Sequence, residues 1–517
     1  MAQRLDAVSR TLGLGAAAAP VALVLAAFVG IALRAEPGGF GPGDWAAIRF
    51  TVVQAFLSAA ISVVLAIPLA RALARRRFVG QGILVVLLGV PFILPVIVAV
   101  AGLLAVFGRT GWLNTALDAV GLPGVAVYGL HGVVLAHVFF NLPLATRLLL
   151  QGWMGVPAER FRVAAQLDLT PRAVLRTIEV PILRQIVPGA FALIFVICLT
   201  SFAVALTLGG GPRATTIELA IYQSFRFDFD LSRAALLSAV QLVLAGGAAV
   251  LALGIVPPIT LGGGLDRSVR RWDARAGLQR WADAAAIALG ALFLLLPLGA
   301  VVLRGIPGLW DLPSSVWQAA WVSLQVAALS ILVVLALSLP MAGWIASRPR
   351  GGVEAIGLLG LSASPLMIGT GWFILLNPVA DPVRLALPVT ALVNALMALP
   401  FVLRILVPRL RDTLEQFGRL GAMLRMRGWA VWRWILLPRL SAQIGFAAGL
   451  TGALSIGDLG VIALFADPER ATLPLQMYRL MGAYRMESAA GAALILLALA
   501  LTIFWICDRG GRWHAAT

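Results

Sequence analysis

The sequence contains no lysine and few of the residues that commonly build reactive sites. It has 517 residues, of which only 12% are charged, with two cysteines and three histidines. Without lysine the chain can form neither a P-loop nucleotide site nor a lysine Schiff base. Cys198 and Cys507 lie in apolar runs, which argues against a disulfide framework or a cysteine zinc site, and no HExxH pattern occurs. We therefore expect no catalytic residue, metal ligand or cofactor in this chain.

Apolar residues dominate instead. They make up 61% of the chain, and the mean hydropathy is +0.96. Uncharged runs long enough to cross a bilayer predict an all-α integral membrane protein with about 12 transmembrane helices. The runs are 11–33, 50–70, 78–108, 119–146, 185–212, 234–265, 284–303, 312–347, 355–380, 385–403, 440–457 and 488–507. The first is too long for the apolar region of a signal peptide and no A-x-A site follows, so we expect a retained helix.

The basic residues indicate how the chain is oriented. All 40 are arginine, and the net charge of +17 alone would suit a nucleic-acid-binding protein. With the N-terminus inside, however, 29 arginines fall on the inner side of the membrane and 11 on the outer side. This asymmetry obeys the positive-inside rule and predicts that both termini are cytoplasmic. The charge then faces anionic lipid, and nucleic acid is not expected as a partner.

The chain also contains an internal repeat. Asn141–Leu142–Pro143 before Arg147 matches Ala398–Leu399–Pro400 before Arg404 at an offset of 257, and further upstream the offset drifts to 270–272. Because the paired elements face the same side, the pattern predicts two parallel six-helix repeats. The predicted organisation is a first half at 1–265 (core about 46–257), a cytoplasmic linker at 266–283 and a second half at 284–517 (core about 316–507).

Two long basic loops, at 147–185 and 404–440, occupy equivalent repeat positions. Thr170–Pro171 predicts the start of a short helix in the first loop and Pro181 its end. The second loop follows the same plan, with Gly428 at the turn and Pro438 at the end. Such helices could lie on the lipid surface or dock a partner subunit. Their recurrence at equivalent positions favours docking.

Both loops resemble the cytoplasmic EAA loop of ATP-binding-cassette importer permeases, whose pattern is E-A-A-x3-G-x9-I-x-L-P. Neither copy has the Glu, and Asp168 and Arg425 replace the Gly. In that family the loop inserts a short coupling helix into a groove on the ATPase subunit. The coupling residues that this resemblance implies are Ala164, Ala165, Asp168, Ile178, Pro181, Gly421, Ala422, Arg425, Ile435 and Pro438.

Longer stretches resemble the fused two-half permeases of thiamine and thiamine-pyrophosphate importers. They are LAHVFFNLPLATRLLLQ ending at Gln151, LGGGPRATTIELAIYQ ending at Gln223 and LSIGDLGVIALF ending at Phe465. This resemblance implies a non-enzymatic permease of the bacterial inner membrane that works by alternating access. It also implies two ATPase subunits, which hold ATP and magnesium, and a periplasmic substrate-binding protein.

Asp458 is the sharpest candidate for the substrate path. A carboxylate at the centre of a span costs about 2.5–3.5 kcal/mol on insertion scales, so it usually faces a cavity or a partner. It could meet a cationic substrate such as thiamine, cap a helix break at Gly457 and Gly460, or pair with an arginine. Its counterpart at the 257 offset is Ser201.

Other polar or glycine-rich positions have two interpretations each. A candidate outer gate, which could equally be a helix C-cap and turn, comprises Gly210, Arg213, Thr215, Arg470 and Thr472. His137 and Asn141 are expected to hydrogen-bond between helices. Helix kinks are expected at Pro95, Pro143, Pro365 and Pro400.

Two alternatives to a thiamine importer stay open at this point. The first is a permease of the same family for ferric iron or another small solute. The second is an ion-coupled secondary transporter, which can also have a parallel six-plus-six repeat. Such carriers usually contain relays of carboxylates or histidines, whereas Asp458 is the only carboxylate within a predicted span.

Overall fold

The computed structural model describes residues 7–35, 40–209, 211, 214–255, 277–347, 364–426, 428–465 and 470–516. Over these residues the chain has no strand, and eleven helices are long and apolar enough to cross a membrane. The predicted run at 355–380 contains a shorter apolar helix, α16 (Pro365–Leu376). The prediction of an all-α membrane protein with about twelve spans is confirmed.

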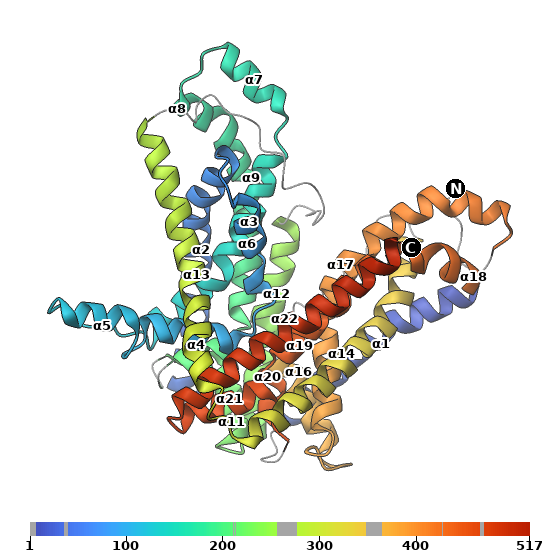
Figure 1. Ribbon diagram of the computed structural model, residues 1–517. Helices are drawn as coiled ribbons and strands as arrows, with labels where there is room; N and C mark the ends of the chain where they lie inside the picture. The colour runs from blue at the N-terminus through green and yellow to red at the C-terminus, as the bar shows by residue number, and fades with distance from the viewer. Residues whose placement is uncertain are drawn as a thin grey trace.

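The helices form two arms that meet at one end and diverge at the other (Figure 1). The first arm is built around α2 (Pro42–Arg75), α6 (Leu130–Met154), α9 (Val180–Leu199) and α12 (Leu231–Ile255). The second is built around α14 (Ser314–Ala346), α17 (Ala386–Met423), α19 (Leu437–Ile456) and α22 (Met486–Ala516). Both ends of the described chain and both long loops lie toward the diverging ends of the arms (Figure 1).

Matched packing relates the two halves. In the first half α2, α6 and α9 pack together, and α14, α17 and α19 do so in the second. The short helices α11 (Ile217–Arg226) and α21 (Leu473–Gly482) pack on α12 and α22 respectively. Tyr222 and Tyr478 occupy the same position in these two helices. The repeat is therefore parallel, as predicted.

The first helix of each half packs against the other half. Helix α1 (Ala7–Arg34) contacts α14 and α16 of the second half as well as α12 of its own. Helix α13 (Gly277–Gly308) contacts α2 and α4 (Val96–Phe107) of the first half as well as α22 of its own. A Cβ on Gly371 would clash with the backbone oxygen of Ala27, and one on Gly102 with that of Pro297. Glycine at these two equivalent positions lets the exchanged helices approach closely. The exchange interlocks the halves.

Several boundaries differ from the predicted ones. The run at 78–108 is not a single helix but α3 (Gln81–Leu87), η1 (Val90–Phe92) and then α4. The run at 119–146 begins as helix only at Leu130, because α5 (Trp112–Ala119) and a turn precede it. Helix α13 begins at Gly277, within the segment predicted as a linker.

Of the four prolines expected to kink helices, two lie inside helices and two at helix starts. Pro143 and Pro400 lie inside α6 and α17, as a kink requires. Pro95 instead precedes α4 as its N-cap, and Pro365 is the first residue of α16. Proline fits these places because the first backbone N–H groups of a helix have no partner within it.

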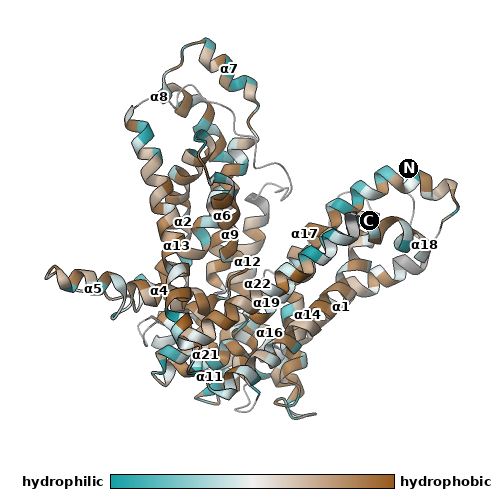
Figure 2. Cartoon of the chain, viewed as in Figure 1, coloured by the Kyte–Doolittle hydropathy of each residue, from teal (hydrophilic) through white to brown (hydrophobic). Residues whose placement is uncertain are grey.

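The surfaces of the arms suit a lipid environment. Figure 2 shows apolar residues along α13, α14 and α1, and polar residues gathered on α7 (Ala158–Gln166). Large apolar side chains such as Leu332, Val64 and Trp321 are more than 60% exposed. Such exposure is expected where lipid takes the place of solvent.

Candidate functional site

The first candidate region is the pair of long loops. The first contains α7, α8 (Pro171–Val174) and η2 (Leu175–Glu179), and the second contains α18 (Trp429–Val431) and η6 (Trp432–Leu436). Thr170 is the N-cap of α8, as predicted: its side chain accepts a hydrogen bond from the Ala173 N–H at 3.3 Å. Gly428 adopts a left-handed φ of +54° before α18.

Pro181 and Pro438 do not end their helices, so that prediction was wrong. Each lies in the first turn of a long helix, α9 or α19, directly after a five-residue π turn. Proline cannot donate the usual i→i−4 hydrogen bond, and its ring clashes with that carbonyl. The wider π turn accommodates the proline, and the chain continues as helix.

A matched turn stands where the importer motif has glycine. Asp168 and Arg425 have left-handed φ values of +46° and +52°. At the first turn, the Leu169 N–H donates to the Ala164 carbonyl at 3.1 Å, and the Asp168 N–H donates to the Ala165 carbonyl at 3.2 Å. The second loop repeats this pattern, with Met426 and Arg425 donating to Gly421 and Ala422 at 2.9 and 3.1 Å. These are Schellman caps, in which glycine is the favoured residue.

The predicted coupling residues divide into a buried and an exposed group. Ala164, Gly421 and Ile435 are buried, and Ala165 and Ile178 are half-buried. The exposed members are Asp168, Pro181, Ala422, Arg425 and Pro438. Two leucines that the motif did not include, Leu167 and its counterpart Leu424, are 66% and 63% exposed. Each loop thus presents an apolar residue at the same place.

A second candidate region lies where two long helices break. Helix α9 ends at Leu199 and the chain resumes as α10 (Ala203–Leu208), while α19 ends at Ile456 and resumes as α20 (Gly460–Phe465). Ser201 lies in the first break and is half-buried, and Asp458 lies in the second. The sequence predicted neither the break at Ser201 nor the equivalence of the two breaks.

Asp458 caps its break with one oxygen only. Its Oδ1 accepts a hydrogen bond from the Gly460 N–H at 3.1 Å, as the capping interpretation predicts. Its Oδ2 is buried and has no hydrogen-bond partner among the described residues. Capping therefore explains why Oδ1 of Asp458 is buried, but not why Oδ2 is buried.

The break at Asp458 contacts both halves of the chain. A Cβ on Gly457 would lie 3.0 Å from Pro95, which precedes α4 of the first half. A Cβ on Gly460 would lie 3.8 Å from the Phe202 ring and 4.0 Å from Pro365. Phe202 follows the first break, and Pro365 begins α16. The breaks therefore meet at the seam between the halves.

Glu218, which the sequence analysis missed, lies at the same seam. It is fully buried in α11, and its Oε1 accepts a hydrogen bond from Gln241 Nε2 at 3.1 Å. The same amide donates to the carbonyl of Leu199, the last residue of α9, at 2.9 Å. Burial raises the pKa of Glu218 to about 8, and hydrogen bonds from Ser364 and Gln241 lower it. Glu218 follows a loop rather than lying within a long apolar run, so hydropathy gave no signal for it.

Aromatic rings line the seam on the side of α11. The rings of Phe202 and Tyr222 are 5.3 Å apart, and those of Phe225 and Phe373 are 4.5 Å apart in an edge-to-face arrangement. Phe373 lies 5.5 Å from Phe465. The Phe225–Phe373 contact joins α11 of the first half to α16 of the second, and the other two pairs lie within one half each. The Phe225–Phe373 contact thus links the arms at the end where they meet.

The predicted gate residues occupy different environments. Gly210 and Arg213 lie outside the described residues, and Arg470 is exposed. Thr215 donates to the Gly211 carbonyl at 3.3 Å. Thr472 is buried as the N-cap of α21, and the structure pairs it with Thr216, the N-cap of α11, at an offset of 256.

Each arm contains a polar cluster that joins helices of that arm, and the two clusters occupy equivalent positions. In the first, the Ser58 hydroxyl lies 3.2 Å from His137 Nδ1, and Asn141 Nδ2 donates to Cys198 Sγ at 3.4 Å. The expected interhelical hydrogen bonds of His137 and Asn141 are thus confirmed. In the second, Ser330 and Ser455 hydroxyls lie 2.8 Å apart, and Asn394 Nδ2 donates to Ser455 at 3.1 Å.

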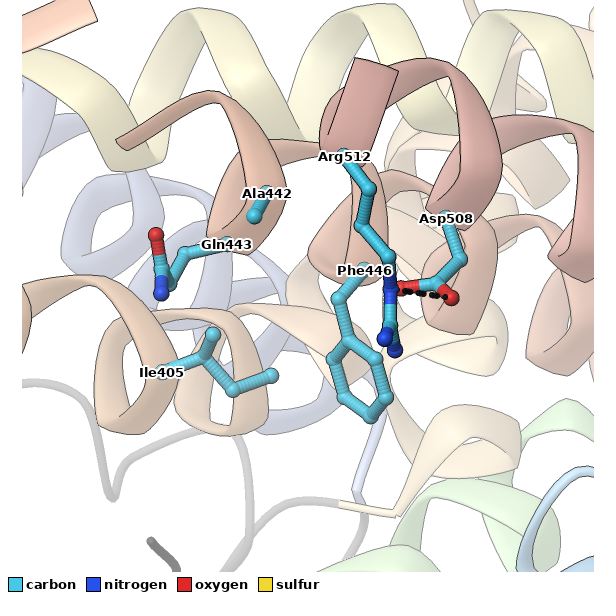
Figure 3. A pocket seen from close by; sticks show the side chains of 6 residues that line it. All are labelled: Ile405, Ala442, Gln443, Phe446, Asp508 and Arg512. Atoms are coloured by element: carbon cyan, nitrogen blue, oxygen red, sulfur yellow. Dashed lines mark ion pairs between the residues drawn. The ribbon is translucent and has the colours of Figure 1, made fainter. Parts of the chain in front are cut away.

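A cavity of about 320 Å³ lies in the second arm, away from the seam. Figure 3 shows the residues that line it: Ile405, Ala442, Gln443, Phe446, Asp508 and Arg512. Asp508 and Arg512 form an ion pair of 2.9 Å on α22. On α19, Gln443 lies roughly 20 Å of helix before Ile456, the last residue ahead of the break that contains Asp458. None of the predicted site residues lines this cavity.

Comparison with known proteins identifies the family. The chain is 40% identical to the thiamine transport system permease protein ThiP of Salmonella typhimurium, over 98% of this chain and 97% of that protein. It is 39% identical to ThiP of Escherichia coli, over 96% of each chain. The chain belongs to the thiamine transport system permease family. ThiP of Haemophilus influenzae, at 34% identity over 88% of this chain, is a further member.

A more distant relative matches only one half. The molybdenum transport system permease protein ModB of Mycobacterium bovis is 30% identical over 250 residues, which is 93% of that protein but 47% of this chain. No protein-family model matches the chain. A permease half as long as this one, aligned almost completely, agrees with the two-repeat architecture of the thiamine permease family.

Proposed function

We propose that this chain is the membrane-spanning subunit of an ATP-driven importer that carries thiamine or its phosphates across the bacterial inner membrane. The observation that carries the proposal is the pair of long loops, which repeat the same left-handed cap, π turn and exposed leucine. A surface helix that only rests on lipid has no need of such identical backbone detail. Two ATPase subunits, one for each loop, explain why it occurs twice.

The arrangement of the arms supports alternating access. The loops lie at the diverging ends, and the aromatic contacts close the opposite end (Figure 1). ATP binding would draw the ATPase subunits and the loops together, so that the arms part at the seam. A periplasmic binding protein would deliver substrate there. The substrate would pass Asp458 and Ser201, with Gly210, Arg213, Thr215, Arg470 and Thr472 as outer-gate residues.

Orientation follows from charge. Because both termini and both arginine-rich loops lie at one end, the positive-inside rule assigns that end to the cytoplasm. ATP and magnesium would be held by the partner subunits there.

Reconstitution in liposomes tests the function. The permease, its ATPase and an external binding protein should import labelled thiamine only when ATP is inside. Asp458→Asn should lower uptake while the complex still assembles, whereas Glu487→Gln, at an exposed carboxyl on α22, should not. Thiamine uptake that persists without the ATPase would support an ion-coupled carrier. Uptake of ferric iron but not of thiamine would support an iron importer.

A further inference from the structure

Two carboxylates at the seam each have an oxygen without a partner. Glu218 Oε2 and Asp458 Oδ2 are buried, and neither accepts a hydrogen bond from the part of the chain that the structure describes. Glu218 comes from the first half and Asp458 from the second. An uncompensated buried carboxylate is costly, so it persists mainly where a partner completes it.

The first turn of α16 brings the two acids to one place. Ser364, its N-cap, lies close enough to Glu218 for the Ser364 hydroxyl to lower the pKa of that acid. The next residue, Pro365, lies against Gly460, whose N–H binds Asp458. Phe202 packs against Gly460 as well, and its ring contacts Tyr222, which lies one helical turn after Glu218 on α11.

We propose that Glu218 and Asp458, together with the rings of Phe202 and Tyr222, form a binding site for an organic cation. Carboxylates and aromatic faces are the groups that bind a positively charged ring without hydrogen-bond donors. The thiazolium ring of thiamine is such a cation. The inference therefore rests on the proposed function and specifies that the site binds the thiazolium ring of the substrate. Because Glu218 and Ser364 come from opposite halves, the site opens when the halves part.

The repeat shows that the fold does not need these acids. The equivalent of Glu218 in α21 is Pro474, and the equivalent of Gln241 is Leu496 in α22. The equivalent of Asp458 is Ser201. The two carboxylates therefore occur once each, in one asymmetric site for a single cation. Bonding to Gln241 accounts for Oε1 of Glu218 but leaves Oε2 unexplained.

Phosphorylation of the substrate should weaken binding at this site. Glu218, whose pKa burial raises to about 8, is ionised when the cation is bound, because a nearby positive charge lowers that pKa. The two carboxylates then attract the ring charge but repel a nearby phosphate. The site therefore favours thiamine over thiamine pyrophosphate.

The test compares uptake of thiamine with that of its neutral thiophene analogue, which keeps the shape but lacks the ring charge. The wild-type importer should show a KM for the neutral analogue at least about tenfold higher than for thiamine. Glu218→Gln and Asp458→Asn should each reduce this ratio to about threefold or less. Glu218→Asp, which keeps the charge, should retain more of the ratio than Glu218→Gln, and Glu487→Gln should leave it unchanged.

The ratio separates charge recognition from damage to the fold, since a misassembled complex loses both substrates together. An unchanged ratio in both neutralised variants overturns the inference and leaves the proposed function standing. A wild-type complex that imports no thiamine contradicts the proposed function and the inference with it.

Discussion

The two halves share a backbone plan but differ in how much charge they bury. In the first half, Arg71 Nε lies 2.6 Å from Oε2 of the fully buried Glu179, and this ion pair ties η2 to α2. At the equivalent positions the second half has Gly343 and Leu436, both buried. The plan is therefore stable with either kind of contact. A buried charge in one half alone points to a local or functional need rather than to the fold.

The largest expected effect tests whether the two loops are equivalent in spite of this difference. Leu167→Asp and Leu424→Asp should each weaken ATPase binding by about tenfold or more, because each puts a charge in an apolar contact worth roughly 1.5–3 kcal/mol. Co-purification of the ATPase subunit measures this. Val79→Asp, at a fully exposed residue outside both loops, is the control. If only one leucine matters, the halves dock differently.

The next effect concerns the ion pair itself. Glu179→Ala leaves Arg71 without this partner and should destabilise the first arm by about 3 kcal/mol. The double variant Arg71→Met/Glu179→Leu gives the first half the apolar character of the second and should recover most of that loss. Thermal melting in detergent measures both. A double variant as unstable as Glu179→Ala would mean that the charges are required and that the comparison of halves fails.

Several features were predictable from sequence because they depend on local patterns. Apolar runs predicted the spans, and Thr170–Pro171 predicted a helix start. The helix break at Ser201, the exchange of α1 and α13 and the burial of Glu218 depend on packing between distant segments. Pro181 and Pro438 misled the prediction because a π turn, which leaves no simple sequence signal, keeps each proline within a helix.

A smaller effect is expected in the matched polar clusters. Ser455→Ala removes the hydroxyl that meets Ser330 and Asn394, and should cost about 1 kcal/mol. Ser455→Cys copies Cys198 from the equivalent position of the first half and should cost less. Melting temperatures of the two variants check the order. If Ser455→Cys is the more damaging of the two, the clusters are not interchangeable.

The smallest effect concerns the left-handed residues of the two loops. Glycine pays no steric penalty at a positive φ, whereas other residues lose about 1 kcal/mol there. Arg425→Gly and Asp168→Gly should therefore both raise the melting temperature of the isolated permease. The gain should be larger for Arg425→Gly, because aspartate tolerates the left-handed region better than arginine does. Arg419→Gly, which falls inside the helical part of α17, should lower the melting temperature and serves as the control. Loss of stability in all three variants would show that the side chains of Asp168 and Arg425 make contacts outweighing the strain, and that the two loops keep their shape for different reasons.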